Sequence, residues 1–145
     1  MEFISSEEFQ NQPKEVQKVF MEWWKPSIGD LFIIEKTTSF NGDRHDFVEC
    51  FLTGFEITDL TEREMKKIKC PLFTESQLIK FIEDKTDCII SELSLNKNGY
   101  TLIIGYKTEY IDGEPRTKKI FRNLKSDLLQ AYWKVALEVA KESVE

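Results

Sequence analysis

Two turn-forming dipeptides in the second half of the chain, Asn98-Gly99 and Asp112-Gly113, restrict the fold more than any other feature. Both pairs tolerate the positive φ angles that tight hairpin turns require. The segments around them are rich in β-branched and aromatic residues, which favours strands. The sequence therefore predicts three consecutive antiparallel strands, over Cys88–Leu95, Tyr100–Thr108 and Arg116–Arg122.

A second predicted hairpin lies in the first half of the chain, where Leu31–Thr37 and Asp46–Ile57 have the composition of strands. Asn41-Gly42 supplies a turn between them, in a loop that we expect to hold His45, the one histidine. Three other segments have apolar residues every three or four positions, which predicts helices. They run from about Gln12 to Trp24, from Thr74 to Asp84 and from Ser126 to Glu142.

The start of the second helix is specified by a capping box, because Thr74 and Gln77 have the Thr-x-x-Gln spacing. In this motif each side chain accepts a hydrogen bond from the backbone N–H of the other residue. Cys70-Pro71 lies just before the helix, and proline interrupts regular hydrogen bonding. We therefore expect a break in secondary structure there, with an exposed Cys70 thiol.

Short connections between these elements favour antiparallel neighbours over parallel crossover units. The predicted fold is α+β, with an antiparallel sheet of about five strands and about three helices packed mainly on one face. A chain of 145 residues with 41% hydrophobic residues can bury a core of its own. We therefore expect a single α+β domain over residues 1–145.

The charge and the cysteines restrict the setting in which the protein works. The formal net charge of −6 opposes generic nucleic-acid binding, which depends on Lys and Arg displacing counterions from phosphates. No apolar run reaches the roughly 18 residues of a membrane-spanning helix. Three widely spaced cysteines without a Cys-x-x-Cys pair are typical of a reducing compartment. We expect a cytoplasmic protein that contacts no membrane and binds no generic nucleic acid tightly.

The patterns that mark common catalytic sites are missing from the sequence. It has no phosphate-binding glycine loop and no hydrolase nucleophile elbow, and one histidine with three scattered cysteines makes no metal signature. Glu83-Asp84-Lys85 matches half of a metal-dependent nuclease motif, but such triplets arise by chance in a chain that is 32% charged. We expect no catalytic residue, no metal and no cofactor. A small hydrolase built on carboxylates and His45 is kept as an alternative.

A basic segment near the end of the predicted sheet is the first candidate binding site. Its cationic side chains are Arg116, Lys118, Lys119, Arg122 and Lys125, with no acidic residue among them. Such a patch can hold phosphates or an acidic protein surface. The alternative is structural, because alternate residues of a last strand point into water in any case.

Three tryptophans are the second candidate, namely Trp23, Trp24 and Trp133. Adjacent helical residues point about 100° apart, so Trp23 and Trp24 cannot both face the same neighbour closely. An exposed tryptophan often anchors a protein partner, since it offers a large contact area at a low entropic cost. The alternative is that a broad helix face packs under a loop.

Three segments occur in the same order as in a known group of proteins. They are EWWKPSIGDLF (Glu22–Phe32), CPLFTESQLIKFIEDK (Cys70–Lys85) and DLLQAYWKVALEVAKE (Asp127–Glu142). With its Trp-x-Pro turn, its Pro-Leu-Phe-Thr-Glu-x-Gln-Leu helix start and its Ala-Tyr-Trp in the last helix, the chain resembles an uncharacterised family of small prophage proteins from low-GC Gram-positive bacteria. The resemblance implies a phage-type accessory protein, and no activity is attached to the family.

The favoured hypothesis is a non-enzymatic accessory protein of phage or prophage type that binds a macromolecular partner. A host replication or defence factor is one candidate partner, and a homo-oligomer is another form that the chain can take. Two alternatives remain open. One is a nucleotide or nucleic-acid binding module that uses residues 116–125, and the other is the small carboxylate-based hydrolase.

Overall fold

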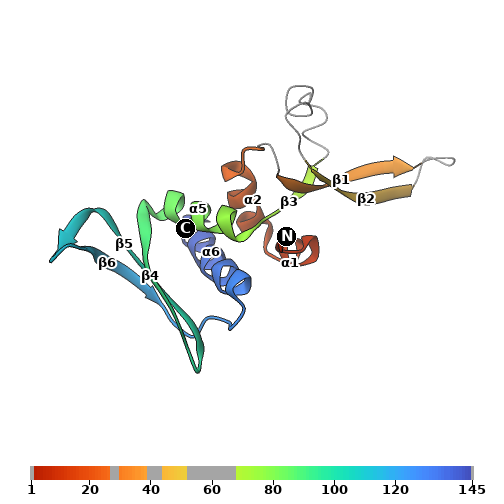
Figure 1. Ribbon diagram of the computed structural model, residues 1–145. Helices are drawn as coiled ribbons and strands as arrows, with labels where there is room; N and C mark the ends of the chain where they lie inside the picture. The colour runs from red at the N-terminus through yellow and green to blue at the C-terminus, as the bar shows by residue number, and fades with distance from the viewer. Residues whose placement is uncertain (1, 27–29, 39–43, 52–67, 145) are drawn as a thin grey trace. The chain divides into compact units, whose positions relative to one another are not determined.

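The computed structural model describes residues 2–26, 30–38, 44–51 and 68–144, and for residues 34–38, 44–51, 68 and 69 it describes the backbone alone. The chain divides into two compact units (Figure 1). Ser5–Phe73 form the N-terminal unit, and Met1–Ile4 with Thr74–Glu145 form the C-terminal unit. The expectation of one domain over residues 1–145 stays a prediction.

The N-terminal unit combines two helices with a three-stranded antiparallel sheet of order β2-β1-β3. Its elements are α1 (Ser6–Gln10), α2 (Lys14–Trp23), β1 (Leu31–Thr38), β2 (Arg44–Phe51) and β3 (Ile68–Leu72). Helix α2 and strand β1 were predicted from the sequence, whereas α1 was not. The Ser5 hydroxyl caps α1 by accepting a hydrogen bond from Glu8 N–H at 3.2 Å.

Three phenylalanine rings form the aromatic core of the N-terminal unit. Phe9 from α1, Phe20 from α2 and Phe73 after β3 are all almost fully buried. Their ring centroids lie 5.4 to 6.1 Å apart in tilted and edge-on arrangements, the geometry that aromatic pairs prefer. Burial of these rings explains why the short helix α1 forms, since five residues cannot sustain a helix on their own.

Strand β3 corrects the prediction of a break at Cys70-Pro71. Pro71 lies opposite Phe32 of β1 within the sheet, and an edge strand tolerates the missing N–H of proline. The prediction of an exposed Cys70 was wrong as well, because the thiol is fully buried. Burial raises the pKa of Cys70 to about 11. His45 was placed in a loop, but its backbone lies in β2 opposite Thr37.

The C-terminal unit consists of two longer helices and a second antiparallel sheet, of order β4-β5-β6. Its elements are α5 (Glu75–Thr86), β4 (Cys88–Asn96), β5 (Gly99–Ile111), β6 (Glu114–Phe121) and α6 (Leu128–Val144). All five were predicted from the sequence, with somewhat shorter strands and an earlier start for the last helix. The α+β class is confirmed, but the described strands form two sheets of three instead of one sheet of about five.

Helix α5 begins with the predicted capping box. The Thr74 N–H donates to Gln77 Oε1 at 2.9 Å, and the Thr74 hydroxyl donates to the same oxygen at 3.3 Å. The helix ends at Thr86, and the left-handed φ of 53° at the next residue, Asp87, turns the chain directly into β4. Glu83 helps to fix this turn, because its Oε2 accepts the Ile90 N–H at 3.0 Å.

The register of the C-terminal sheet separates a core face from an outer face. Leu102 lies opposite Phe121, and both are buried with the apolar sides of α5 and α6. The neighbouring residue Ile103 lies opposite Glu92 on β4 and Ile120 on β6. Because side chains alternate along a strand, these three residues share the other face. We call this surface, with Glu92, Ile103 and Ile120, the outer face.

Candidate functional site

The β5–β6 hairpin carries most of the predicted basic segment, and its register contains a large bulge. Gly105 pairs with Thr117 and Tyr110 pairs with Pro115, so residues 106–109 of β5 lie opposite Arg116 alone. Arg116 binds both ends of the bulge. Its guanidinium lies 4.6 Å from the ring centroid of Tyr106, and its Nε is 2.6 Å from Glu109 Oε2. The residue thus closes the bulge from the opposite strand.

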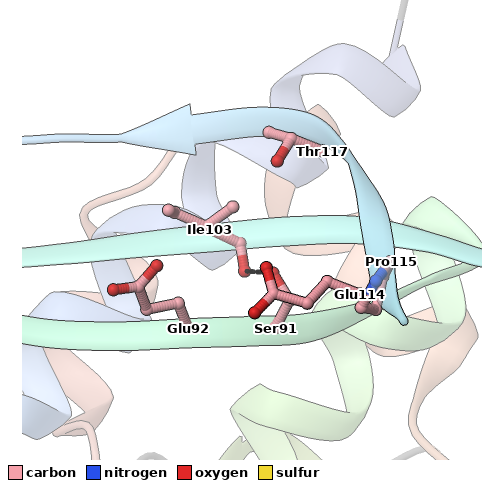
Figure 2. A pocket seen from close by; sticks show the side chains of 6 residues that line it. All are labelled: Ser91, Glu92, Ile103, Glu114, Pro115 and Thr117. Carbon is pink, nitrogen blue, oxygen red and sulfur yellow. Dashed lines mark hydrogen bonds between the residues drawn. The ribbon is translucent and has the colours of Figure 1, made fainter. Parts of the chain in front are cut away.

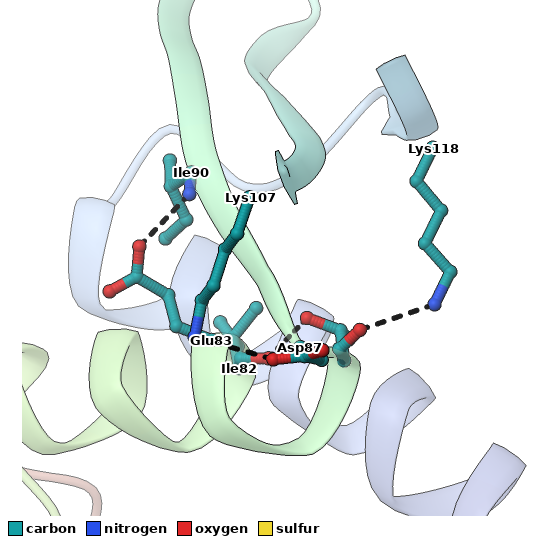
Figure 3. A network of polar contacts seen from close by, with 7 residues as sticks. Ile82, Glu83, Asp87, Ile90, Lys107 and Lys118 are labelled. Atoms are coloured by element: carbon teal, nitrogen blue, oxygen red, sulfur yellow. Dashed lines mark hydrogen bonds and ion pairs between the residues drawn. The ribbon is translucent and has the colours of Figure 1, made fainter. Parts of the chain in front are cut away.

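Lys118 and Lys119 are also engaged within the unit. Figure 3 shows Lys118 reaching the end of α5, where its Nζ donates to the Thr86 carbonyl oxygen at 3.3 Å. A cation is favourable there because the carbonyls at a helix C-terminus carry partial negative charge. Lys119 Nζ lies 2.6 Å from Glu142 Oε1 and joins β6 to α6. Three of the five predicted cations therefore have structural partners.

Arg122 and Lys125 differ from the other three cations of the segment. Both are exposed, and within the described part of the chain neither side chain makes an ion pair or hydrogen bond. Their backbone is nevertheless anchored beside β5, because Leu124 N–H donates to the Tyr100 carbonyl at 3.0 Å. Tyr100 N–H in turn donates to the Lys125 carbonyl at 3.4 Å. The structure therefore presents two unpaired cations on an anchored turn.

The outer face contains a hollow of about 390 Å³ (Figure 2). Its lining residues are Ser91, Glu92, Ile103, Glu114, Pro115 and Thr117. Two features of the strands shape its lining. Ser91 is the extra residue of a bulge in β4, and its hydroxyl donates to the Ile103 carbonyl at 3.2 Å. Pro115 packs closely against Gly105, because a Cβ on Gly105 would approach Pro115 Cβ to 2.8 Å.

The tip of the same hairpin exposes two large apolar side chains in sequence. Tyr110 is 58% exposed and Ile111 is 59% exposed. The turn that follows has positive φ at both central residues, 52° at Asp112 and 83° at Gly113. This geometry matches the twist of two paired strands and makes a tight, regular turn. The tip therefore holds an apolar pair at the end of a hydrogen-bonded hairpin.

The predicted tryptophans lie mostly in the interior. Trp24 and Trp133 are only 7% and 3% exposed. The Trp24 indole N–H donates to Asp30 Oδ2 at 3.0 Å, so its polar atom is satisfied inside the N-terminal unit. Trp23 is half-buried, with its ring 6.2 Å from that of Phe73. Of the three tryptophans, Trp23 has the most accessible surface, and binding by any of them stays a prediction.

Residues of the hydrolase alternative are scattered over the structure. Glu83-Asp84-Lys85 lies inside α5, and the Glu83 carboxylate is the acceptor that joins this helix to β4. The side chain of His45 lies outside the description. Among the described residues, no group of three or more His, Cys, Asp or Glu side chains is arranged to hold a metal ion. No described helix is both long enough and apolar enough to cross a membrane.

The predicted basic segment and the exposed features of the structure lie on the same hairpin but involve different residues. Basic side chains drew attention to residues 116–125, whereas the exposed apolar pair and the hollow involve Tyr110, Ile111, Glu92 and Glu114. The sequence does contain a signal for the exposed apolar pair, because Tyr110-Ile111 comes directly before the predicted Asp112-Gly113 turn. Apolar residues at a hairpin tip have little chance of burial by the sheet they belong to.

In comparisons with known proteins, no family model, no curated protein and no solved structure matches the chain.

Proposed function

We propose that this chain is a non-enzymatic protein that binds a macromolecular partner, and that the tip of the β5–β6 hairpin is its principal contact. The observation that carries the proposal is the exposure of Tyr110 and Ile111, which are 58% and 59% accessible. Large apolar side chains in sequence at such exposure mark interaction sites. Tyrosine is also enriched among residues that dominate binding energy.

The surroundings of the tip support a protein partner with an apolar pocket and a basic rim. Asp112 and Glu114 flank the tip, and both are exposed. Carboxylates beside an apolar anchor favour a partner of opposite charge, since complementary charges speed association and exclude wrong partners. The hydrogen-bonded hairpin supports such a role too, because a pre-ordered element loses little entropy on binding.

Anion binding by the basic segment has less support than protein binding by the hairpin tip. Arg116 and Lys119 are paired with Glu109 and Glu142, and Lys118 contacts the end of α5. A phosphate would have to compete with these contacts. A cytoplasmic location, a prophage origin and a host replication or defence factor as partner belong to the same proposal, on the strength of the sequence and the family resemblance.

The test is capture with the full chain as bait in an extract of a low-GC Gram-positive bacterium, followed by titration with the purified captured protein. The informative variant is Tyr110→Ser with Ile111→Ser. Leu95→Ser is the matched control, because Leu95 is 58% exposed near the other hairpin turn of the same sheet. We expect the control to bind like the wild type and the tip variant to bind at least tenfold more weakly, as loss of two apolar anchors requires.

Circular dichroism and a denaturant melt establish that both variants are folded. Equal binding by the tip variant and the wild type would refute the hairpin tip as the contact. Absence of any captured protein that is sensitive to the tip substitutions would count against the proposed function as a whole.

A further inference from the structure

Four charged side chains of the C-terminal unit have no partner among the described residues. Glu92 and Glu114 line the hollow, while Arg122 and Lys125 belong to the turn after β6. Within the residues that the structure describes, none of the four makes an ion pair or a side-chain hydrogen bond. Arg116 and Lys119 of the hairpin are, by contrast, paired inside the unit. The four unpaired side chains are therefore available to a partner.

These charges follow a regular order along β6. The acidic hollow extends from Glu114 at the start of the strand to Glu92 of β4, which lies in the same row across the sheet as Ile120. Ile120 is 39% exposed on the outer face, and the unpaired cations follow the end of the strand. Arg122 follows Ile120 by two positions, the spacing that keeps side chains on one face of an extended chain. Acid, apolar and basic groups thus succeed one another along one surface.

We infer that the outer face docks a second copy of this chain. A two-fold axis in the plane of the contact makes the two β6 strands antiparallel, so the basic end of one copy lies over the acidic end of the other. Ile120 then lies near the axis and meets its counterpart. The Arg122 side chain enters the hollow of the opposite copy between Glu92 and Glu114, and the same contact occurs a second time by symmetry.

The outer face is a better docking surface than the free edge of β6. Pro115 has no N–H to donate at that edge. Lys118 and Lys119 also belong to this strand, and lysines on an edge strand oppose pairing with another chain. Contact through Ile120 on the outer face needs no backbone pairing with the edge of β6, so these features do not oppose it. The contact goes beyond the proposed function and does not use Tyr110 or Ile111.

The association is measured by sedimentation equilibrium of the full chain at low ionic strength over a range of concentrations. We expect the mass to rise from 17.1 kDa towards twice that value, and to fall again when salt is added. Two charge-reversal variants test the contact, Arg122→Glu and Glu92→Lys with Glu114→Lys. Each alone should weaken dimerisation about tenfold or more, because both symmetric contacts become repulsive.

The decisive sample is an equimolar mixture of the two variants. In the mixed dimer the carboxylate that Arg122→Glu introduces faces the hollow whose two acids have become lysines, while the unchanged Arg122 of the other copy faces the unchanged acids. Both contacts are attractive again, so we expect the mixture to dimerise at concentrations at which neither variant does so alone. Lys134→Glu on α6 is the matched control and should dimerise like the wild type, as should Tyr110→Ser with Ile111→Ser.

A wild type that stays monomeric at every concentration would overturn the inference. Dimers that tolerate both charge reversals, or a mixture that fails to associate, would do so as well. Circular dichroism of each variant separates loss of contact from loss of fold. Since the hairpin-tip substitutions leave this association unchanged, its failure and the failure of the proposed function are distinguishable.

Discussion

Gly99 shows at the scale of one residue how the hairpin between β4 and β5 is fixed. Its φ of 107° belongs to a region that side chains rarely adopt. A Cβ at this position would also overlap the Leu124 carbonyl oxygen and lie 2.9 Å from the Leu124 carbonyl carbon. The segment after β6 is hydrogen-bonded beside this turn, so it cannot withdraw without losing its bonds to Tyr100. Backbone conformation and close approach both require glycine here.

Gly99→Ala should therefore lower the free energy of unfolding by about 2 kcal/mol or more, from backbone strain together with the steric overlap. Gly113→Ala is the matched control. Its φ of 83° is also positive, but a Cβ there meets nothing within 4 Å, so strain alone applies. That control should lose only about 1 kcal/mol. Denaturant melts measure both changes in unfolding free energy. Equal losses in the two variants would mean that the Leu124 backbone does not pack tightly against Gly99.

At the scale of the element, the capping box of α5 is the local structure that the sequence specified best. The hydrogen bond from Thr74 N–H to Gln77 Oε1 leaves that backbone donor satisfied at the start of the helix. The Thr74 hydroxyl uses the same oxygen. The Thr74 N–H and hydroxyl therefore both contact the Gln77 side chain, so this side chain contributes to the cap together with Thr74.

We expect Thr74→Ala to cost about 0.5 to 2 kcal/mol of unfolding free energy, and Gln77→Ala to cost about 0.5 to 1.5 kcal/mol. Ser76→Ala is the control, since Ser76 is exposed one position before Gln77 and alanine suits a helix. It should change stability by less than about 0.5 kcal/mol. Urea melts of the three variants measure the effects. A Gln77→Ala protein as stable as the Ser76→Ala control would exclude the side chain from the cap.

Elements defined by local patterns could be predicted, whereas those defined by distant contacts could not. Helices α2, α5 and α6 follow from apolar periodicity, and β4, β5 and β6 follow from their turn dipeptides. Helix α1 is too short for a periodic signal and depends on the burial of Phe9. Strand β3 contains Pro71, which argues against a strand until the neighbouring strand β1 is known. The bulge opposite Arg116 has no local signature at all.

The candidate surfaces show the same limit at the scale of the whole molecule. The basic segment could be identified from the sequence because its charges cluster within residues 116–125, but only the fold reveals that Glu109 and Glu142 pair with Arg116 and Lys119. Glu142 is distant in sequence, so no local pattern could have paired it with Lys119. The division of the strands between two sheets was also missed, because local composition determines that a strand forms and not which strands pair.

The balance of charge leads to a last prediction, that the protein does not bind generic single- or double-stranded DNA tightly. The net charge of −6 repels phosphates over about a Debye length, roughly 10 Å at 0.1 M salt. Binding by Arg116 and Lys119 would first break their pairs with carboxylates. A fluorescence titration at about 0.15 M salt should therefore give a dissociation constant near or above the micromolar range.

Removing the carboxylates that pair with Arg116 and Lys119 tests whether these ion pairs limit DNA binding. Glu109→Gln with Glu142→Gln removes both partner carboxylates and leaves every cation in place, so binding should strengthen at low salt and its salt dependence should become steeper. Glu138→Gln with Asp112→Asn is the matched control, because it changes the net charge equally without touching those two ion pairs. If the control strengthens binding as much, net charge alone limits the affinity. Submicromolar, salt-sensitive binding by the wild type that disappears in Lys118→Glu, Lys119→Glu and Arg122→Glu would instead promote the basic segment to a nucleic-acid site.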